Sequence, residues 1–400
     1  MKIHTIEEAL LDIANGKMVI VVDDEQRENE GDIVLAAEFV TPELINKMIK
    51  MSSGLICVPV SPALSEKLEL APMIRENTAK FGVNFSFSID AAHGITTGAS
   101  VYDKAVTIKT MTLPDANAKM FVRPGHIFPL IAKKGGVLER PGHTEAAVDL
   151  VRLAGLSSLA IISEITNEDG SMARLAQLFN IAQKLDLKIV SIEDLIKYRY
   201  MHEKIVREIE SVHLPTDYGN FRLHVFENEL DHSISFAQVK GNYKNSIVPV
   251  RIHSECFTGD VLGSIRCDCG KQLDMAMSYL QKKECGILIY LKQEGRGIGL
   301  KNKIKAYKLQ DDEGCDTIQA NHKLGFADDL RHYAIASQIL KHYGITDIEL
   351  LTNNPNKIAD LLFYGINITK RIPLEIPWQE SNEKYLLTKK QKMNHLFSNF

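Results

Sequence analysis

The sequence predicts a fold between α/β and α+β: two mixed α/β domains in tandem, each with a sheet covered by helices. Short β-rich runs alternate with helical patterns almost throughout the chain. The 400 residues, 45% hydrophobic and 24% charged, suffice for two or three domains with ordinary globular cores. A highly charged helical stretch from Ser191 to about Ile209 separates the halves, so we expect domains at 1–200 and 201–400.

Hydrophobic runs and capping signals define the elements of the first half. The N-terminal stretch predicts an amphipathic helix that stops at Gly16, and Thr41 followed by Pro42 marks the start of a second helix. The predicted strands are Met18–Asp23, Leu55–Val60 and Leu159–Ile165, and the further helices are Thr41–Met51, Glu145–Leu153 and Ser171–Leu185.

The second half begins with a β-rich set and continues with alternating helices and strands. The predicted strands are Phe221–Glu227, Ser233–Val239, Ile247–His253, Gly286–Leu291 and Asp347–Thr352, and the predicted helices are Lys271–Lys283, Asp329–Tyr343 and Pro355–Tyr364. The tail from Pro377 to Phe400 has little periodicity, so we expect residues 377–400 to be loosely ordered and assign them no function.

Charge, hydropathy and cysteine content argue against several functional classes. A net charge of −4 is unlike that of a dedicated nucleic-acid binder. No run approaches the ~18 apolar residues of a membrane span, and Glu7, Glu8 and Asp12 stand where a signal peptide is apolar. We therefore expect a cytoplasmic protein that binds neither nucleic acid nor membranes. Six cysteines in a chain this long form no disulfide framework, and close-spaced ones suggest a metal site.

Chemically active residue types in the first half gather in an acidic loop and in the stretch RPGHTE. The loop Asp23–Asp32 reads DDEQRENEGD and follows a predicted strand. It is either a solvated surface loop or, given its position and its arginine, a site where a hard cation bridges to an oxygen-rich anionic substrate. RPGHTE, Arg140–Glu145, opens a helix whose first amides, with Arg140 and Thr144, form a candidate phosphate cradle. His143 is then a ligand, a base or a capping residue, and Glu164 is structural or catalytic.

Several motifs of the first half occur together in a recognisable order. They are RENEGD, NTAKFG (Asn77–Gly82), TTGAS (Thr96–Ser100), RPGH (Arg123–His126) and RPGHTEAAVDL. The set closely resembles 3,4-dihydroxy-2-butanone 4-phosphate synthase of riboflavin biosynthesis. The resemblance implies an Mg²⁺ or Mn²⁺ enzyme, commonly a homodimer, that converts ribulose 5-phosphate to 3,4-dihydroxy-2-butanone 4-phosphate and formate.

The same resemblance implies roles for individual residues. Glu28 and His143 match the metal ligands, and His126 and Glu164 match the residues of catalytic proton transfer. The implied substrate contacts are Arg27, Glu28, Asp32, Arg140, Pro141, Gly142, His143, Thr144 and Glu164. These residue types fit the chemistry, because enolisation beside a carbonyl needs a positioned base and a cation that stabilises the enediolate.

In the second half, three cysteines and a glycine-rich turn carry the functional signal. Cys256, Cys267 and Cys269 have the spacing C-x10-C-x-C, which favours metal ligation over buried free thiols. No fourth cysteine or suitably spaced histidine completes a structural zinc site, so a coordination position stays open, as in a catalytic zinc site. The stretch QEGRGIGL, Gln293–Leu300, suggests a close backbone approach to a ligand. Asp329 and Arg331 fall at the start of a predicted helix and are an ordinary surface pair on their spacing alone.

This half also resembles a known family, GTP cyclohydrolase II, across about residues 205–375. The motifs are RIHSECFTGD, RCDCG, QEGRGIGL, YKLQ, DTIQANHKLGFADDLR and LLTNNPNK. The resemblance implies opening of the guanine imidazole ring of GTP with loss of formate and pyrophosphate. Cys256, Cys267 and Cys269 match the Zn²⁺ ligands. Asp329 matches the proton acceptor and Arg331 the nucleophile at the α-phosphate, although a guanidinium is better suited to clamp phosphate than to attack it.

The GTP-binding positions of that family match a further set of residues in this sequence. They are Arg251, Ile252, His253, Ser254, Glu255, Gln272, Glu294, Gly295, Arg296, Thr317, Thr352 and Lys357. The leading hypothesis is therefore a bifunctional riboflavin-biosynthesis enzyme with ribulose 5-phosphate and GTP as substrates. The alternatives are an N-terminal half reduced to a scaffold, and a zinc-organised nucleic-acid or interaction module that uses Lys301–Lys308 to contact phosphates.

Overall fold

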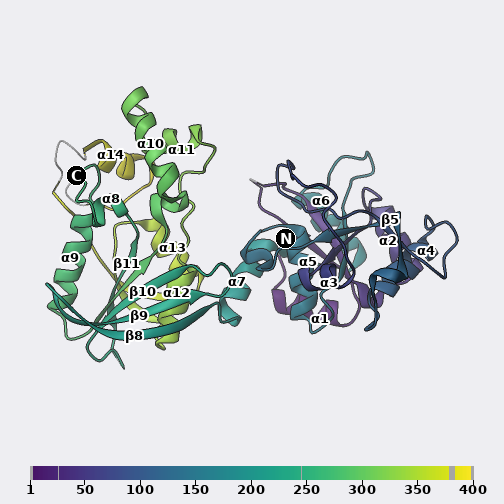
Figure 1. Cartoon of the computed structure of the whole chain (residues 1–400), viewed down its shortest axis with the longest axis horizontal. Helices are drawn as coiled ribbons and strands as arrows, with labels where there is room; N and C mark the ends of the chain where they lie inside the picture. Colours follow the sequence, from purple (N-terminus) through teal and green to yellow (C-terminus); the bar gives the residue numbers. More distant parts are fainter. Residues whose placement is uncertain (1–2, 26, 245, 378–382, 398–400) are drawn as a thin grey trace. The chain divides into compact units, whose positions relative to one another are not determined.

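The computed structural model describes residues 3–25, 27–244, 246–377 and 383–397. The chain forms two compact units, Met1–Arg199 and Tyr200–Phe400, each with its own sheet (Figure 1). Within the described ranges, no helix is both long enough and apolar enough to cross a bilayer.

The N-terminal unit is built on a mixed seven-stranded sheet of order β4-β5-β3-β6-β2-β1-β7. β1 and β2 run antiparallel, as do β2 and β6, whereas β7 is parallel to β1 and β5 is parallel to β3. The strands are β1 Val19–Val22, β2 Gly31–Ala36, β3 Cys57–Val60, β4 Ile89–Ala91, β5 Phe121–Ile131, β6 Ala160–Glu164 and β7 Lys188–Ser191.

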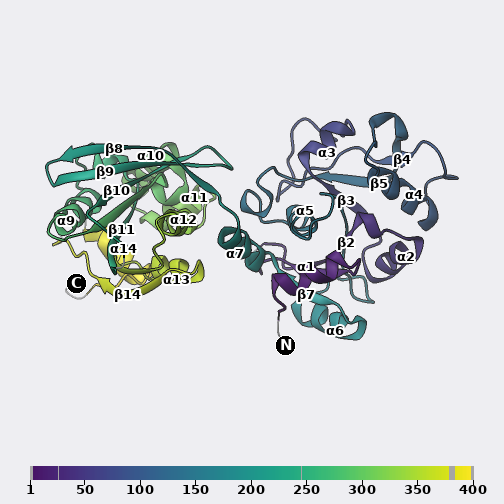
Figure 2. The ribbon, with the colours of Figure 1, turned by 90° about the horizontal axis from the view of Figure 1, so that it is seen from below.

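Helices cover both faces of this sheet, which gives a three-layer unit (Figure 2). One face packs against α2, α4 and α6, and the other packs against α1, α5 and α7. The helices are α1 Ile6–Ala14, α2 Pro42–Met51, α3 Pro62–Lys67, α4 Val101–Met111, α5 His143–Leu153, α6 Leu175–Leu185 and α7 Ile192–His202. Thr41 caps α2 as the sequence predicts, because its side chain accepts the N–H of Leu44.

The C-terminal unit has a second seven-stranded sheet, of order β14-β13-β11-β12-β10-β9-β8. β8, β9 and β10 form an antiparallel meander, and β11, β12, β13 and β14 are parallel. The strands are β8 Val206–Thr216, β9 Gly219–Asn228, β10 Ile234–Lys240, β11 Val248–Ser254, β12 Gly286–Leu291, β13 Asp347–Leu351 and β14 Asn367–Ile372. The carboxyl ends of β11, β12 and β13 meet at one edge, where open α/β sheets bind ligands.

The helices of this unit pack on the sheet or surround that edge. α9 packs on a core that contains Phe221, Leu288 and Leu351. The helices are α8 Phe257–Asp260, α9 Cys269–Gln281, α10 Gly299–Glu313, α11 Thr317–Lys323, α12 Ala334–His342, α13 Pro355–Phe363 and α14 Glu383–Lys392. The predicted fold class is thus confirmed, since both units are mixed sheets covered by helices.

The charged stretch predicted as one helix to Ile209 is instead a helix followed by a strand. α7 ends at His202, and β8 begins at Val206. Gln338 explains the break: its side-chain oxygen accepts the N–H groups of Ile205 and Val206 at 2.7 and 3.2 Å, while its amide donates to the carbonyls of Tyr200 and Glu203. A tertiary contact therefore ends the helix that local sequence favours.

Two further expectations need correction. The helix predicted from Asp329 begins at Ala334, because Asp329 accepts the backbone N–H of Arg331 and holds a turn there. The tail, expected to be loosely ordered, contains α14, whose Leu386 and Lys389 are buried. Tertiary packing stabilises a helix that its weak periodicity does not predict. Residues 378–382 and 398–400 of the tail lie outside the described residues.

Candidate active sites

The candidate site of the N-terminal unit is a cavity of about 90 Å³ at the start of β2 and the end of β6. Asp32 on β2 and Glu164 on β6 are paired in register across the two strands. The predicted residues that line the cavity are Arg27, Glu28, Asp32, Arg140, His143, Thr144 and Glu164. Pro141 and Gly142 do not line it but form the turn that leads into α5.

The described residues of the acidic loop after β1 are joined by hydrogen bonds to Asp23. Asp23 accepts the backbone N–H groups of Glu28 and Glu30 at 3.0 and 2.9 Å and the Arg27 guanidinium at 2.9 Å. Asn29 takes a left-handed conformation with φ of 56°, which lets the loop turn back toward β2. Asp24 and Glu25 are exposed, whereas Arg27, Glu28 and Glu30 are partly buried and are held by Asp23 or line the cavity.

Opposite charges hold the centre of this cavity together. Glu28 Oε2 lies 3.4 Å from His143 Nδ1 and 2.9 Å from Arg27. Burial raises the pKa of Asp32 to about 6, and the carboxylates of Glu164 and Glu28 add to that effect. Burial alone would lower the pKa of His143, but Asp32 and Glu28 outweigh it and raise the pKa to about 9. The cavity thus concentrates negative charge around one imidazole.

These residues fit a hard divalent cation. Single ligand atoms of Asp23, Glu28 and His143 lie within 4.8 Å of one another, and carboxylate oxygens with one imidazole suit Mg²⁺ or Mn²⁺. Among the described residues, buried Asp32 Oδ1 and His143 Nε2 have no hydrogen-bond partner. A hydrated cation or a sugar hydroxyl would satisfy such groups.

The remaining predicted residue, His126, lies elsewhere. It is on β5, its ring is 45% exposed, and its Nδ1 lies 2.7 Å from Asp90 Oδ2. It does not line the cavity that Glu164 lines. A single chain therefore does not bring the two predicted proton-transferring residues together.

The three cysteines of the C-terminal unit converge as predicted. The Sγ atoms of Cys256, Cys267 and Cys269 all lie within 4.8 Å of one another, and Cys256 Sγ is 3.6 Å from Cys267 Sγ. Thiolates in tetrahedral zinc sites lie ~2.3 Å from the metal, which places them about 3.8 Å apart. This donor set fits Zn²⁺, and three protein ligands leave one tetrahedral position open.

The environment of Cys256 favours a thiolate. Lys303 Nζ donates to Cys256 Sγ at 3.1 Å and also contacts Glu294 at 2.8 Å. Hydrogen bonds from Cys267 and Cys269, with the Lys303 ammonium, hold the pKa of Cys256 well below its usual range. Lys303 belongs to the basic stretch Lys301–Lys308, which a nucleic-acid or interaction module would use to contact phosphates. Its side chain is instead buried beside the cysteine thiols.

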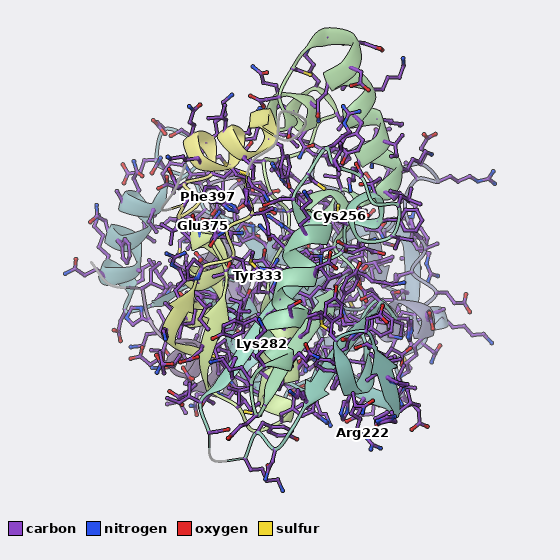
Figure 3. The ribbon with its side chains drawn as sticks, turned by 90° about the vertical axis from the view of Figure 1, so that its left-hand side faces the viewer. Arg222, Cys256, Lys282, Tyr333, Glu375 and Phe397 are labelled. Atoms are coloured by element: carbon purple, nitrogen blue, oxygen red, sulfur yellow. The ribbon has the colours of Figure 1, made fainter. Side chains whose placement is uncertain are left out.

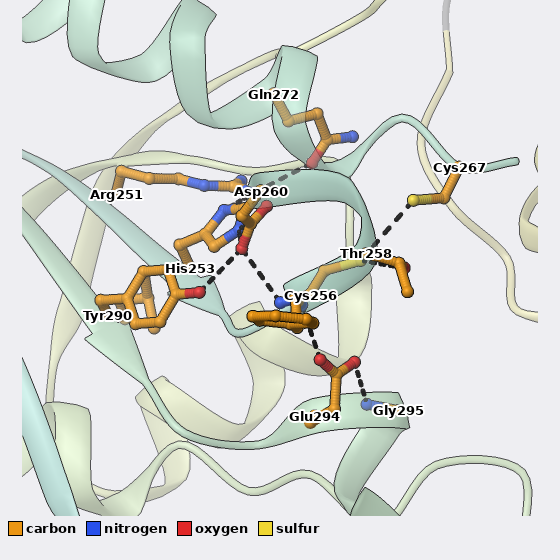
Figure 4. A network of polar contacts seen from close by, with 12 residues as sticks. Arg251, His253, Cys256, Thr258, Asp260, Cys267, Gln272, Tyr290, Glu294 and Gly295 are labelled. Carbon is orange, nitrogen blue, oxygen red and sulfur yellow. Dashed lines mark hydrogen bonds and ion pairs between the residues drawn. The ribbon is translucent and has the colours of Figure 1, made fainter. Parts of the chain in front are cut away.

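A second network orders the turn that carries Cys256 (Figure 4). Asp260 accepts hydrogen bonds from the Tyr290 hydroxyl at 2.8 Å and from the Cys256 backbone N–H at 3.0 Å, and its carboxylate lies 3.0 Å from His253 Nε2. Glu294 accepts the backbone N–H of Phe257 at 2.6 Å. These contacts fix the position of Cys256, the first cysteine of the cluster, relative to β11 and β12.

Two adjoining cavities surround the cysteines. The larger, of about 480 Å³, is lined by the predicted residues Ser254, Glu255, Glu294, Gly295, Arg296, Thr317 and Arg331, together with all three cysteines. The smaller, of about 60 Å³, is lined by Arg251, His253, Gln272, Thr352 and Lys357, and it shares Ser254, Arg296 and Arg331 with the first. Ile252 lines neither cavity, and its carbonyl accepts a hydrogen bond from Lys357 Nζ at 2.6 Å.

The glycine-rich turn packs against the loop before α12 and also lines the larger cavity through Gly295. Arg296 and Gly297 have φ of 62° and 92°, and a Cβ on Gly297 would lie 2.9 Å from Leu330 Cβ. Arg296 also accepts the Leu330 N–H through its carbonyl at 3.0 Å. The glycines therefore let this turn dock on the segment that carries Asp329 and Arg331.

Asp329 and Arg331 form a two-point ion pair. Arg331 Nε lies 2.9 Å from Asp329 Oδ1, and Arg331 Nη2 lies 2.5 Å from Asp329 Oδ2. Both residues are in the loop before α12. Residues two apart do not face each other on a helix, but that restriction does not apply in a loop. Arg331 lines both cavities, whereas Asp329 lines neither and contacts the guanidinium through both carboxylate oxygens.

Four site residues are missing from the sequence-based set: Asp23, Asp260, Tyr290 and Lys303. Asp23 belongs to the acidic loop but has no distinguishing signal within it. Asp260 ends the motif RIHSECFTGD but has no assigned role in it. Tyr290 and Lys303 act from a distance in sequence; Lys303, for example, is 47 residues from Cys256. The C-terminal segment is also missing, since Tyr385, Lys389 and His395 line the smaller cavity.

Comparisons with known proteins agree with both halves. The profile of the 3,4-dihydroxy-2-butanone 4-phosphate synthase family matches residues 7–198, and that of GTP cyclohydrolase II matches residues 206–373. The riboflavin biosynthesis protein RibBA of Bacillus mycoides (strain KBAB4) is 52% identical over 397 residues, which is 99% of both chains. RibBA of Chlorobium phaeovibrioides (strain DSM 265 / 1930) is 51% identical over 399 residues, covering 99% of this chain and 97% of the relative.

A solved structure is similar over most of the chain. RibBX from A. baumannii, described as a two-domain 3,4-dihydroxy-2-butanone 4-phosphate synthase, superposes with a TM-score of 0.71 at 34% identity and covers 94% of this chain and 100% of that chain. Two profiles in tandem, full-length relatives and two separate sites lead to one conclusion. The chain belongs to the RibBA family of bifunctional riboflavin-biosynthesis enzymes, which joins 3,4-dihydroxy-2-butanone 4-phosphate synthase to GTP cyclohydrolase II.

Proposed function

We propose that the N-terminal cavity converts ribulose 5-phosphate to 3,4-dihydroxy-2-butanone 4-phosphate and formate with Mg²⁺ or Mn²⁺ held by Glu28 and His143. Asp23 is close enough to be a third ligand or to support Glu28. When bound, the cation stabilises negative charge on an enediolate. The observation that carries this assignment is the convergence of Glu28, Asp32, His143 and Glu164 in one cavity.

In that cavity the protein groups have separate tasks. The first turn of α5 and Arg140 face the same space, which suits a phosphate or another anionic substrate group. Arg140 also pairs with Glu145 and donates to the Phe81 carbonyl at 2.9 Å, so its guanidinium is held in place. Glu164 is exposed at the end of β6, where a carboxylate can accept a proton from a sugar carbon.

We propose that the N-terminal unit acts as a homodimer, as the family resemblance implies. The support is that His126 lies outside the cavity lined by Glu164, with its ring partly exposed. A second copy is then the source of the second proton-transferring group. The thiols of the other unit need a reducing compartment, so we place both reactions in the cytoplasm, with no nucleic-acid or membrane partner.

We propose that the C-terminal unit opens the guanine ring of GTP at a zinc ion held by Cys256, Cys267 and Cys269. When bound, zinc activates water for hydrolysis. The larger cavity is within the usual size range of small-ligand pockets and contains all three cysteines, so it suits the nucleoside. Glu255 and Glu294 line it with carboxylates that can accept guanine N–H groups.

The phosphate end of GTP then faces Arg331. Because Asp329 holds the guanidinium in a fixed orientation, we assign Arg331 to electrostatic stabilisation of charge at the α-phosphate rather than to nucleophilic attack. Asp329 is a positioning residue in this account. Arg251 and Lys357, which line the smaller cavity, complete the positive lining for phosphate oxygens.

Metal removal and replacement test these assignments on the full-length protein. After chelation both substrates should remain unconverted. Added Zn²⁺ alone should restore formate release from GTP, and added Mg²⁺ alone should restore formate release from ribulose 5-phosphate, because the donor sets differ in softness. Restoration of both reactions by one metal would contradict the separate assignment.

A further inference from the structure

The smaller cavity of the C-terminal unit has an unusual charge. Arg251, Arg296, Arg331, Lys357 and Lys389 all line it, and no carboxylate does among the residues that the structure describes. Its volume of about 60 Å³ suits a small group such as a phosphoryl rather than a nucleoside. Burial, together with repulsion from Arg251 and Arg331, holds the pKa of Lys357 well below its usual range. An anion in the cavity would relieve that repulsion.

Several of these cations donate to neutral oxygens. Arg251 donates to the Leu351 carbonyl at 3.0 Å and to the Gln272 side chain at 2.9 Å, and Lys357 donates to the Ile252 carbonyl at 2.6 Å. Buried Arg251 Nε and Arg296 Nη2 have no hydrogen-bond partner within the described part of the chain. The lining therefore offers donors that an anionic ligand can use.

The C-terminal segment supplies part of this lining. Lys389 lies on α14, is 8% exposed and lies 2.6 Å from Asp268, the residue between Cys267 and Cys269. His395 follows α14, and both of its buried ring nitrogens have no partner among the described residues. In Figure 3, Phe397 and Cys256 lie toward the same end of the unit, whereas Arg222 lies at the opposite end.

The ring of His395 is neutral. Burial and the positive charges of Lys389, Arg331 and Lys357 lower its pKa to about 2. A neutral imidazole keeps one N–H to donate and does not add to the repulsion among the cations. The cyclohydrolase profile ends at residue 373, so both Lys389 and His395 lie beyond the segment that it matches.

We propose that Lys389 and His395 are polyphosphate-binding residues, so that the C-terminal segment is part of the GTP site. Lys389, held between Asp268 and the Tyr385 ring, faces the cavity as a fixed cation. His395 donates a hydrogen bond to a phosphate oxygen beside Arg331 and Lys357. The segment thereby links the zinc-binding turn, through Asp268, to the phosphate end of the substrate. This inference rests on the proposed GTP site.

The test uses full-length, zinc-loaded protein with inorganic tripolyphosphate and guanosine as probes. Lys389→Gln and His395→Phe should each weaken tripolyphosphate binding by about tenfold, the loss expected for one charge-assisted contact. The KM for GTP should rise by a similar factor, and kcat should change less. Guanosine affinity, zinc content and ribulose 5-phosphate conversion should stay unchanged. Lys305→Gln, which removes a positive charge from an exposed position of α10, is the control and should alter none of these values.

Two results would overturn the inference. One is unchanged tripolyphosphate affinity in both folded variants; the other is a loss of guanosine and tripolyphosphate affinity by equal factors, which indicates a merely structural role. Lys389→Gln could lose zinc indirectly, because Lys389 pairs with Asp268 between two of the cysteines. In that case His395→Phe tests the phosphate-binding role, because the described residues include no hydrogen bond or ion pair between His395 and Asp268. Absence of GTP turnover in the unmodified protein would contradict the proposed function instead, and the tripolyphosphate measurement would still judge the inference.

Discussion

Arg331 and Asp329 act as one unit, because two parallel N–H to oxygen contacts fix the guanidinium. Arg331→Lys keeps the charge but removes the planar fork, so it should not behave as a conservative change. We expect pyrophosphate release from GTP to fall by at least about tenfold, which corresponds to ~1.4 kcal/mol of barrier.

The matched control is Arg207→Lys, since Arg207 also pairs with a carboxylate but lies on β8 and lines neither cavity. A coupled assay for pyrophosphate on both variants gives the comparison. Unchanged pyrophosphate release in Arg331→Lys would show that the fork is not needed.

Lys303 contacts the sulfur of Cys256, a proposed zinc ligand, and also pairs with Glu294. Lys303→Met keeps most of the side-chain volume but removes the ammonium that favours the thiolate. We expect zinc affinity to fall by about tenfold to a hundredfold, as for other residues that contact metal ligands. Chelator competition measures this, with Lys301→Met on the exposed face of α10 as the control. Equal zinc affinity in the two variants would refute the role given to Lys303.

The proposed metal ligands are predictable from sequence, whereas the groups that position them are not. Cys267 and Cys269 are separated by a single residue, and such close spacing of cysteines indicates a metal site. Lys303 carries no comparable signal, since its contact with Cys256 depends on how α10 packs beside the turn that follows β11. Glu28 was identified by its motif, but its orientation depends on Asp23, which the sequence does not distinguish from the other acids of the loop.

At the scale of elements, Asp103 connects α4 to the preceding loop. Its carboxylate accepts the N–H and hydroxyl of Thr96 at 3.0 and 2.7 Å and the N–H of Gly98 at 3.1 Å. These hydrogen bonds, of which the one from the Thr96 N–H has the largest effect, lower the pKa of Asp103 to about 2. A depressed pKa means that the stabilisation is complete above the unfolded value of about 3.9 and disappears as the pH falls toward 2.

Amide hydrogen exchange at Thr96 and Gly98, corrected for intrinsic rates, tests this contribution. At pH 6, Asp103→Asn should exchange faster than the unmodified protein at these amides, because an amide oxygen is a weaker acceptor than a carboxylate. The difference should shrink as the pH is lowered to 3. A difference that does not depend on pH would contradict the assignment.

Element boundaries were less predictable than element types. The sequence predicts the strand Gly286–Leu291 with its observed limits, because a short apolar run that begins at a glycine is typical of a buried strand. The end of α7 cannot be predicted from local sequence, since Gln338 on α12, 133 residues from Ile205, determines it. α14 cannot be predicted from local sequence either. Its burial depends on packing at the edge of the smaller cavity, where Lys389 contacts Asp268. Local sequence carries none of these long-range contacts.

At the scale of the molecule, we propose that one chain carries two independent active sites. Each unit has its own sheet, and each candidate metal site is formed within one unit: Glu28 and His143 in the first, the cysteines in the second. The donor sets differ, with oxygen and imidazole in one site and three sulfurs in the other, so we expect each site to select a different metal.

The crossed pair Glu28→Gln and Cys256→Ser tests this claim most directly. Both full-length variants are checked for folding by circular dichroism and assayed with both substrates, with Cys285→Ser as the control for loss of a buried thiol outside the zinc site. Ribulose 5-phosphate conversion should fall by at least about a hundredfold in Glu28→Gln alone, and GTP ring opening by a similar factor in Cys256→Ser alone, since each change removes a proposed metal ligand. Loss of GTP turnover in folded Glu28→Gln protein would contradict the account, because the two sites would then be coupled or shared.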